Sequence, residues 1–223
     1  MIARIKYIIY LLLLSSVVFG SKIAVATKVQ GLVEIMEVGK KDFSKLKAGT
    51  ILSDGDKIRT GSSGFAAIIF IDDKSTLKLK ENSEAVITGQ RTAASISKKI
   101  NMDSGTVRAT VTKQNTDFVI QTPTSVASVK GTDFWLLTDP ETGDEIIGLE
   151  GVVGLTNNET GEEVDVEEGM SGLSTPGGSL GVEETDPSSI PDDPSDEQEG
   201  PSQIRIYLEG PDGEQKVMVI EYQ

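Results

Sequence analysis

Short stretches of alternating apolar and polar residues, separated by turn sequences, follow one another from residue 28 to about residue 174. In one of them Leu77 and Leu79 alternate with Lys78 and Lys80, which places the leucines on one face of an extended strand and the lysines on the other. Turn sequences rich in Gly, Asp and Asn recur about every 8 to 12 residues, a spacing typical of sandwiches, barrels and solenoids. The pattern predicts an all-β domain over residues 28–173.

Three further segments refine this prediction. Residues 65–71 form a continuous apolar run rich in β-branched side chains, which favours a strand covered on both faces. Residues 92–99 fit either a strand or an irregular connection, because their Ser and Thr residues weaken a helical reading. Gly31, Gly105 and Gly151 each precede a Val-containing apolar stretch. This echo predicts repeated strand–turn units that stack on one another, although the same arrangement can recur by chance in a β protein.

The composition argues against enzymatic chemistry. The chain contains no His and no Cys, so it lacks the usual general base near neutral pH and every thiol nucleophile. Cysteine-ligated zinc and iron–sulfur sites are excluded for the same reason. Clustered acids at residues 139–145 could suggest calcium, but their spacing fits a hairpin turn better. We therefore expect no catalytic residues, no cofactor and no metal site.

The formal net charge of −14 is unevenly distributed. Residues 21–135 carry 17 basic and 12 acidic side chains, whereas residues 136–173 carry 11 acidic and no basic side chains. Such acidity keeps an exported protein soluble, and it also makes the chain electrically polar. Nucleic-acid binding is disfavoured, because phosphate contacts require clustered Lys and Arg.

The first 20 residues have the three-part pattern of a secretory signal peptide. Arg4 and Lys6 precede an apolar stretch at residues 8–19, which is shorter than the roughly 20 residues that a membrane-spanning helix needs. Cleavage is expected after Gly20 or after Ala26. The expected location is the periplasm, the cell envelope or the extracellular space, with membrane attachment only if this segment is not removed.

The C-terminal part divides into a linker and a hairpin. Residues 174–203 are rich in Pro, Ser, Gly and acids without apolar periodicity, which predicts a disordered linker. Residues 204–223 contain two alternating runs around Pro-Asp-Gly, the signature of a β-hairpin. Because a lone hairpin is marginally stable in water, we expect it to dock on the main domain or on a partner chain.

Two sequence blocks resemble the FecR domain family of bacterial envelope proteins. The first block, residues 46–79, contains Gly-Asp-Lys-Ile-Arg-Thr-Gly followed by a strand and Asp-Lys-Ser-Thr-Leu-Lys-Leu. The second, residues 104–134, runs from Ser-Gly-Thr-Val-Arg through Thr-Pro to Val-Lys-Gly-Thr-Asp-Phe. The resemblance covers residues 28–173.

This resemblance implies an extended β-solenoid, prism-like or sandwich-like all-β domain outside the inner membrane. In the best-known members the domain senses an outer-membrane transporter and passes the signal to a cytoplasmic anti-sigma segment. Only about seven residues precede the apolar run here, so we do not expect this chain to carry its own anti-sigma segment.

Several residues of the two blocks are candidates for structural roles, and one is a candidate contact. The structural set is expected to form turns, capped turns and core positions, and consists of Gly55, Asp56, Gly61, Gly131, Thr132 and Phe134. Of the two adjacent aromatic residues, one should fill the core and the other should point outward. Trp135, the only Trp, is therefore either a structural plug or an exposed contact for a protein or a glycan.

Taken together, these patterns predict an exported, non-enzymatic binding or scaffolding module for an envelope protein or a cell-wall polymer. Contact would occur through strand edges or the region around Trp135. The alternatives are a periplasmic sensor in a FecR-type signalling pathway and a structural domain without a ligand.

Overall fold

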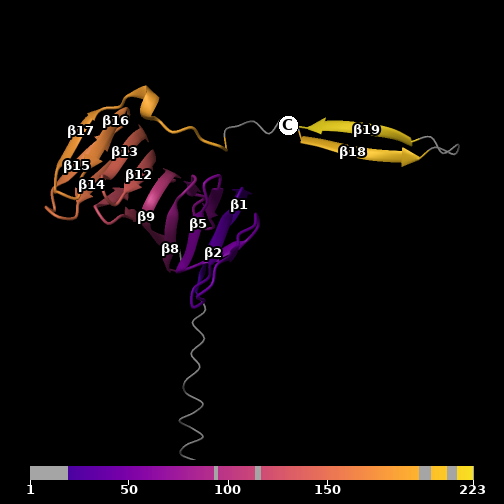
Figure 1. Ribbon diagram of the computed structural model, residues 1–223, viewed down its shortest axis with the longest axis horizontal. Helices are drawn as coiled ribbons and strands as arrows, with labels where there is room; N and C mark the ends of the chain where they lie inside the picture. The colour runs from indigo at the N-terminus through magenta and orange to yellow at the C-terminus, as the bar shows by residue number, and fades with distance from the viewer. Residues whose placement is uncertain (1–19, 93–94, 114–116, 196–201, 210–214, 223) are drawn as a thin grey trace, which may run out of the picture. The chain divides into compact units, whose positions relative to one another are not determined.

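A computed structural model describes residues 20–92, 95–113, 117–195, 202–209 and 215–222 (Figure 1). Apart from Gly20, the predicted signal segment lies outside the described residues. The chain divides into two units, Met1–Pro191 and Asp192–Gln223, each of which is described by itself. Within the described residues, no helix is long and apolar enough to cross a membrane.

The first unit is built from 17 strands that backbone hydrogen bonds connect into one continuous network, arranged as two layers. The first layer contains, in spatial order, β4 (Ile51–Ser53), β1 (Lys22–Gln30), β6 (Phe65–Phe70), β7 (Thr76–Leu79), the second part of β9 (Ile96–Thr110), β12 (Asp133–Asp139), β13 (Gly143–Glu150), β16 (Met170–Ser174) and β17 (Leu180–Glu184). The second layer contains β3 (Ser44–Lys45), β2 (Val33–Met36), β5 (Asp56–Thr60), β8 (Glu84–Arg91), the first part of β9, β10 (Phe118–Gln121), β11 (Ser125–Val129), β14 (Val152–Asn157) and β15 (Glu163–Glu167).

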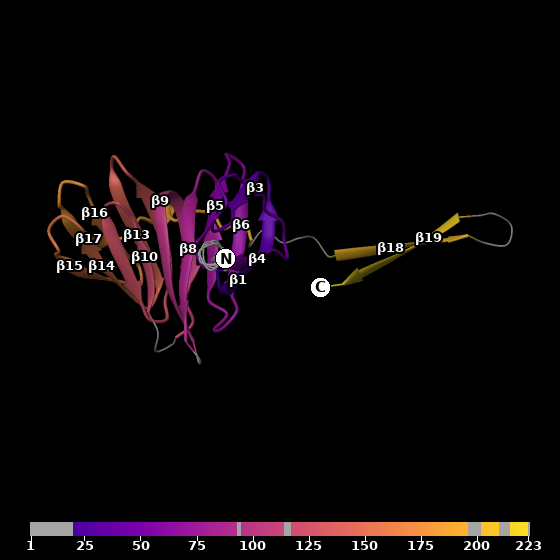
Figure 2. The same ribbon diagram turned by 90° about the horizontal axis from the view of Figure 1, so that it is seen from below.

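From β9 onward the chain adds hairpins to the two layers in turn. The β10–β11 hairpin lies in the second layer, β12–β13 in the first, β14–β15 in the second and β16–β17 in the first. Figure 2 shows the strands following one another along the unit in this order. The pairing of β9 with β10 is parallel, and the other pairings are antiparallel. This path corresponds to the stacked strand–turn units that the sequence predicts.

The core lies between the two layers. Alternating side chains of both layers join one apolar cluster, in which Leu77 and Leu79 are fully buried, as their alternation with Lys78 predicts. Phe70 of the first layer meets Phe118 of the second edge to face, with ring centroids 5.8 Å apart. The all-β prediction is therefore confirmed, and the arrangement combines sandwich packing with a solenoid-like chain path.

Strand β9 connects the layers because it belongs to both. Its residues up to Ser104 pair with β8 in the second layer, and its residues from Gly105 onward pair with β12 in the first. Gly105 has a φ of 115°, and a Cβ there would lie 2.3 Å from Ser83 Oγ. Only glycine combines this backbone conformation with so close an approach.

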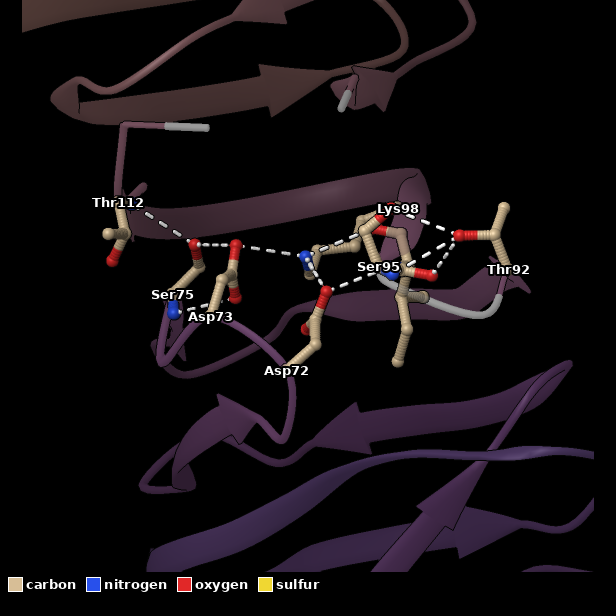
Figure 3. A network of polar contacts seen from close by, with 8 residues as sticks. Asp72, Asp73, Ser75, Thr92, Ser95, Lys98 and Thr112 are labelled. Atoms are coloured by element: carbon tan, nitrogen blue, oxygen red, sulfur yellow. Dashed lines mark hydrogen bonds and ion pairs between the residues drawn. The ribbon is translucent and has the colours of Figure 1, made fainter. Parts of the chain in front are cut away.

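A buried ion network joins the layers at a second place (Figure 3). Lys98 of β9 is fully buried, and its Nζ lies 3.0 Å from Asp72 Oδ2 and 2.9 Å from Asp73 Oδ2 in the β6–β7 turn. Ser75 donates its hydroxyl to Asp73 and accepts the backbone N–H of Thr112. Burial acts to raise the pKa of Asp73, but hydrogen bonds from Lys98 and Ser75 outweigh it and leave this pKa below its ordinary value. The buried ammonium is therefore fully compensated.

The structure corrects the predicted boundaries of the linker and the main domain. The predicted linker, residues 174–203, contains strand β17 and the short 3₁₀ helix η1 (Pro187–Ser189), and the first strand begins at Lys22 rather than residue 28. Thr175 starts a tight turn in which its N–H donates to Ser179, and this turn returns the chain alongside β16. The alternation of Leu180 and Val182 that marks β17 is hidden by the surrounding Gly and Glu residues.

The second unit contains the predicted C-terminal hairpin. Strands β18 (Ser202–Glu209) and β19 (Gln215–Tyr222) pair antiparallel, with Ile204 opposite Ile220. The Pro-Asp-Gly sequence predicted to form its turn lies outside the described residues.

Substitution of Gly105 tests the role of the crossing point. Gly105→Ala should lower the free energy of unfolding by about 3 kcal/mol, because the new Cβ meets Ser83 in a backbone conformation that L-residues disfavour. Gly169→Ala is the matched control, since Gly169 also has a positive φ but a Cβ added there would meet nothing within 4 Å. The control should cost about 1 kcal/mol. Equal losses in urea unfolding would contradict this account.

Substitution of Lys98 tests the ion network. Lys98→Met should cost about 3 kcal/mol at pH 7, because it leaves two carboxylates without their cation. Lys99→Met, at an exposed neighbouring position, should change stability by less than about 0.5 kcal/mol.

The same variant gives a pH dependence of known sign. Because the pKa of folded Asp73 lies below its ordinary 3.8, its contribution is complete above that pH and is lost as the pH falls through the folded pKa. The difference in stability between wild type and Lys98→Met should therefore shrink below about pH 4. A difference that stays constant into this acidic range would contradict the proposed coupling.

Candidate functional site

The predicted motif residues of the first block have structural roles. The carboxylate of Asp56 accepts the backbone N–H groups of Ser53 at 2.7 Å and Val38 at 2.9 Å, and so fastens two chain segments to the start of β5. Burial raises the pKa of Asp56 in spite of these two hydrogen bonds. Gly55 before it has a φ of 90°, as expected for a glycine-dependent turn. Gly61 donates its N–H to the carbonyl of Leu32 at 2.8 Å.

The motif residues of the second block are also placed within the fold rather than on an open surface. Gly131 has a φ of 93° in the turn before β12. Thr132 is buried, its carbonyl accepts the N–H of Val111, and its hydroxyl has no hydrogen-bond partner within the described residues. Phe134 is fully buried in the core between the layers.

Trp135 lies on the other side of β12, on the outer face of the first layer, but it is only 1% exposed. Its cross-strand neighbours are Arg108 on β9 and Ile147 on β13. The expectation that one of the two aromatic residues fills the core and the other points outward is met. The expectation that Trp135 is an exposed contact is corrected, because the side chain is covered where it lies.

Cations flank the indole ring. Arg108 makes a two-point ion pair with Asp133, with Nε at 3.0 Å from Oδ1 and the second nitrogen at 2.9 Å from Oδ2. Arg108 and Lys80 each lie 5.9 Å from the Trp135 ring centroid, within the range of cation–π attraction. The surroundings of Trp135 therefore give it a structural role between β9, β12 and Lys80, the residue that follows β7.

A groove of about 720 Å³ is lined by residues 104–106, where β9 changes layer, by the ends of β12 and β16 and by the start of β13. Its lining combines hydroxyl and carboxyl groups with the side chains of Leu137 and Leu173. One of its acids, Asp144, accepts hydrogen bonds from Thr122 and Ser125 of the second layer. Asp139 caps the β12–β13 turn, where N–H groups from Thr142 and Glu141 lower its pKa. These carboxylates serve the fold, and no cluster of three or more acids suited to a metal occurs among the described residues.

Strand β15, one of the two end strands of the second layer, is the best candidate for a contact site. Within the described part of the chain, β15 pairs only with β14. The N–H of Asn157 donates to Glu162, which fixes the alternation of hydrogen bonds along the pair. The N–H and C=O groups of Val164 and Val166 therefore face β14.

The other three residues of β15 present their backbone outward. Glu163, Asp165 and Glu167 are exposed, and their N–H and C=O groups point away from β14. The carbonyl of Glu167, at the end of the strand, lies against Gly148 of β13. Val166 is buried in the core and fixes the register of the strand. A second open edge, β17, ends the first layer beside β16. Such edges are templates for pairing with another strand.

Sequence reasoning named strand edges as a mode of contact but did not identify this one. The available signal was the Glu-Val-Asp-Val-Glu alternation of residues 163–167. Alternation shows that one face of a strand is buried, but it does not show whether the strand has a neighbour on each side.

Comparisons with known proteins agree with the sequence resemblance. Residues 56–154 match the family model described as FecR protein. Two crystal structures of a candidate anti-sigma factor from Parabacteroides distasonis, at 2.50 and 1.65 Å resolution, resemble the chain with 13% and 14% identity and TM-scores of 0.49 and 0.48. In both, the match covers 58% of this chain and 60% of the other. Likeness at this level carries no argument about function. No curated protein matches the sequence.

Trp135 provides its own test of burial. Because it is the only Trp, its emission should be blue-shifted and resistant to iodide quenching in the folded protein. Trp135→Ala should lower the free energy of unfolding by about 3 to 5 kcal/mol, as for a large buried aromatic residue. Leu137→Ala, at a partly exposed outer position of the same strand, should cost less. Emission typical of a solvated indole, together with an unchanged stability, would restore the exposed-contact reading.

Proposed function

Because this chain carries a FecR domain over residues 56–154, we propose that it is an exported, non-enzymatic binding module that engages an envelope partner by strand addition at β15. The matched segment runs from the start of β5 into β14, the strand with which β15 pairs. The two layers hold this edge strand in place, and the proposed binding involves no covalent step.

The observation that carries the proposal is the outward backbone of β15. Glu163 and Asp165, at alternate positions of an exposed strand, present N–H and C=O groups that pair with no other strand among the described residues. The carbonyl of Glu167 lies against Gly148 of β13. Strand addition uses such groups for affinity and uses the side chains beside them for specificity. The Trp135 region, the other contact predicted from the sequence, is covered.

The first strand supports one of the two expected cleavage positions. Ile23, Ala24 and Ala26 of β1 are fully buried in the core. Cleavage after Ala26 would remove these residues from the sheet, whereas cleavage after Gly20 leaves β1 complete. We propose that export occurs with cleavage after Gly20.

A sensor in a FecR-type signalling pathway is the second candidate function, and the family match favours it. In that case the chain would work with separately encoded signalling parts. The two functions differ in the fate of the N-terminal segment, which a membrane-bound sensor would retain and a released module would lose. N-terminal sequencing of the exported protein separates them.

Blocking the β15 edge tests strand addition. Asp165→Pro removes an outward N–H, and proline is tolerated on an edge strand when this group faces solvent. Asp165→Asn removes the same charge and keeps the N–H. In affinity capture from envelope extracts, the specific partner should bind the Pro variant at least about tenfold more weakly than the Asn variant, because a backbone hydrogen bond is lost and the ring obstructs pairing.

The melting temperature of each variant controls for loss of the fold. Both variants should melt within a few degrees of each other, since neither removes a hydrogen bond between β15 and β14. Equal capture by the two variants would rule out strand addition at β15 as the mode of binding.

A further inference from the structure

The side chains of the β15 edge define the chemistry of the segment that it accepts. We propose that β15 binds an extended segment of a partner protein with Lys or Arg at alternate positions. This inference rests on the proposed strand addition and adds the identity of the partner class to it.

The first step is the coincidence of charge and open backbone. Glu163 and Asp165, whose N–H and C=O groups both point outward, are acidic, and so is Glu167 at the end of the strand. They lie about 7 Å apart, since a strand advances about 3.4 Å per residue. A strand added in register would place every second residue opposite one of these carboxylates, where opposite charges attract.

The second step is the surrounding charge. None of the three carboxylates takes part in a hydrogen bond or ion pair with a side chain elsewhere in the described part of the chain. Residues 136–173 contain no basic residue at all. Nearby basic groups therefore neutralise little of the negative charge of the three carboxylates, and this charge attracts a basic side chain.

The third step is the space beside the edge. Asp165 lies opposite Gly154, and Gly154 lies opposite Ser128 on the next strand. Because Gly and Ser are small, no large side chain fills the outer face of the sheet at these two positions. Glu163 and Asp165 border a hollow of about 520 Å³ that these small residues share with Val119. Lys130 is the one cation in its lining. The hollow can accept the aliphatic part of a long basic side chain whose charged end lies near the carboxylates.

The same features argue against a second copy of this chain as the occupant. Pairing β15 with β15 of another molecule would bring carboxylates opposite carboxylates, which is destabilising. Charged edge strands are a known means of preventing self-association. A basic segment does not meet this charge repulsion. The same carboxylates therefore favour a basic segment over a second copy of β15.

Two isomeric peptides test the inference. Acetyl-Thr-Lys-Val-Lys-Val-Lys-Thr-amide carries its lysines at alternate positions, and acetyl-Thr-Val-Lys-Lys-Lys-Val-Thr-amide has the same composition with consecutive lysines. Fluorescently labelled versions are titrated with the full chain at low salt and followed by anisotropy. The alternating peptide should bind about tenfold more tightly, since it alone can pair with all three carboxylates in one register.

Three variants separate the failure of this inference from the failure of the proposed function. The first is a triple charge variant that combines Glu163→Gln, Asp165→Asn and Glu167→Gln, and the others are Asp165→Pro and Asp165→Asn. The triple variant should bind the alternating peptide about tenfold more weakly and should lose the preference between the isomers. Asp165→Pro should weaken binding of this peptide more than Asp165→Asn does.

Each other outcome has a definite meaning. If Asp165→Pro acts but the combined charge variant does not, strand addition stands and the basic partner is overturned. If the charge variant acts but Asp165→Pro equals Asp165→Asn, the attraction is unspecific and both proposals fall. Equal binding of the isomers, or no binding of either, overturns the inference. Circular dichroism melts of every variant control for unfolding.

Discussion

The structure depends on one strand that serves two layers. The first part of β9 pairs with β8 and the second part with β12, and the change of layer occurs at Gly105. Glycine is required there by a positive φ and by the approach of Ser83. Once β9 is placed, each later hairpin finds a pairing strand already present in one layer or the other. Lys98, on the same strand, then fixes the spacing between the layers through Asp72 and Asp73.

The open edges of the domain follow from the way in which its layers are built. A structure that grows by adding hairpins ends in open edges unless another element covers them. Here the described part of the chain leaves β15 and β17 as the last strands of the two layers. The domain thus presents unpaired backbone at the end where its acidic residues are concentrated. The proposed strand addition would use this unpaired backbone.

Much of the fold was predictable because alternation and turn sequences are local properties. The burial of Leu77, Leu79 and Phe134 follows from patterns a few residues long. The role of Lys98 was not predictable, because a lysine within a polar run gives no indication that two aspartates about 25 residues away will pair with it. The end of the domain was misplaced for a related reason. Strand β17 is short and rich in Gly and Glu, and it is stabilised by its pairing with β16 more than by its own sequence.

The candidate site, too, was predictable from the sequence only in part. The two motif blocks identified the residues that build turns and core, and they drew attention to Trp135 because it is large and unique. Exposure, however, depends on which neighbours cover a side chain, and the ring lies beneath Arg108 and Lys80. The open edge was missed because it is defined by the absence of a neighbouring strand. Pairing of this kind is a property of the whole sheet and has no local signal.

Strand addition at β15 depends most directly on which backbone groups of this strand are free. Amide hydrogen exchange, measured by NMR on the protein without a partner, reports this for each residue. The N–H groups of Glu163, Asp165 and Glu167 should exchange rapidly, while those of Val164 and Val166 should be protected by their hydrogen bonds to β14. Equal protection along all five residues would show that the edge is closed, and it would contradict the central claim.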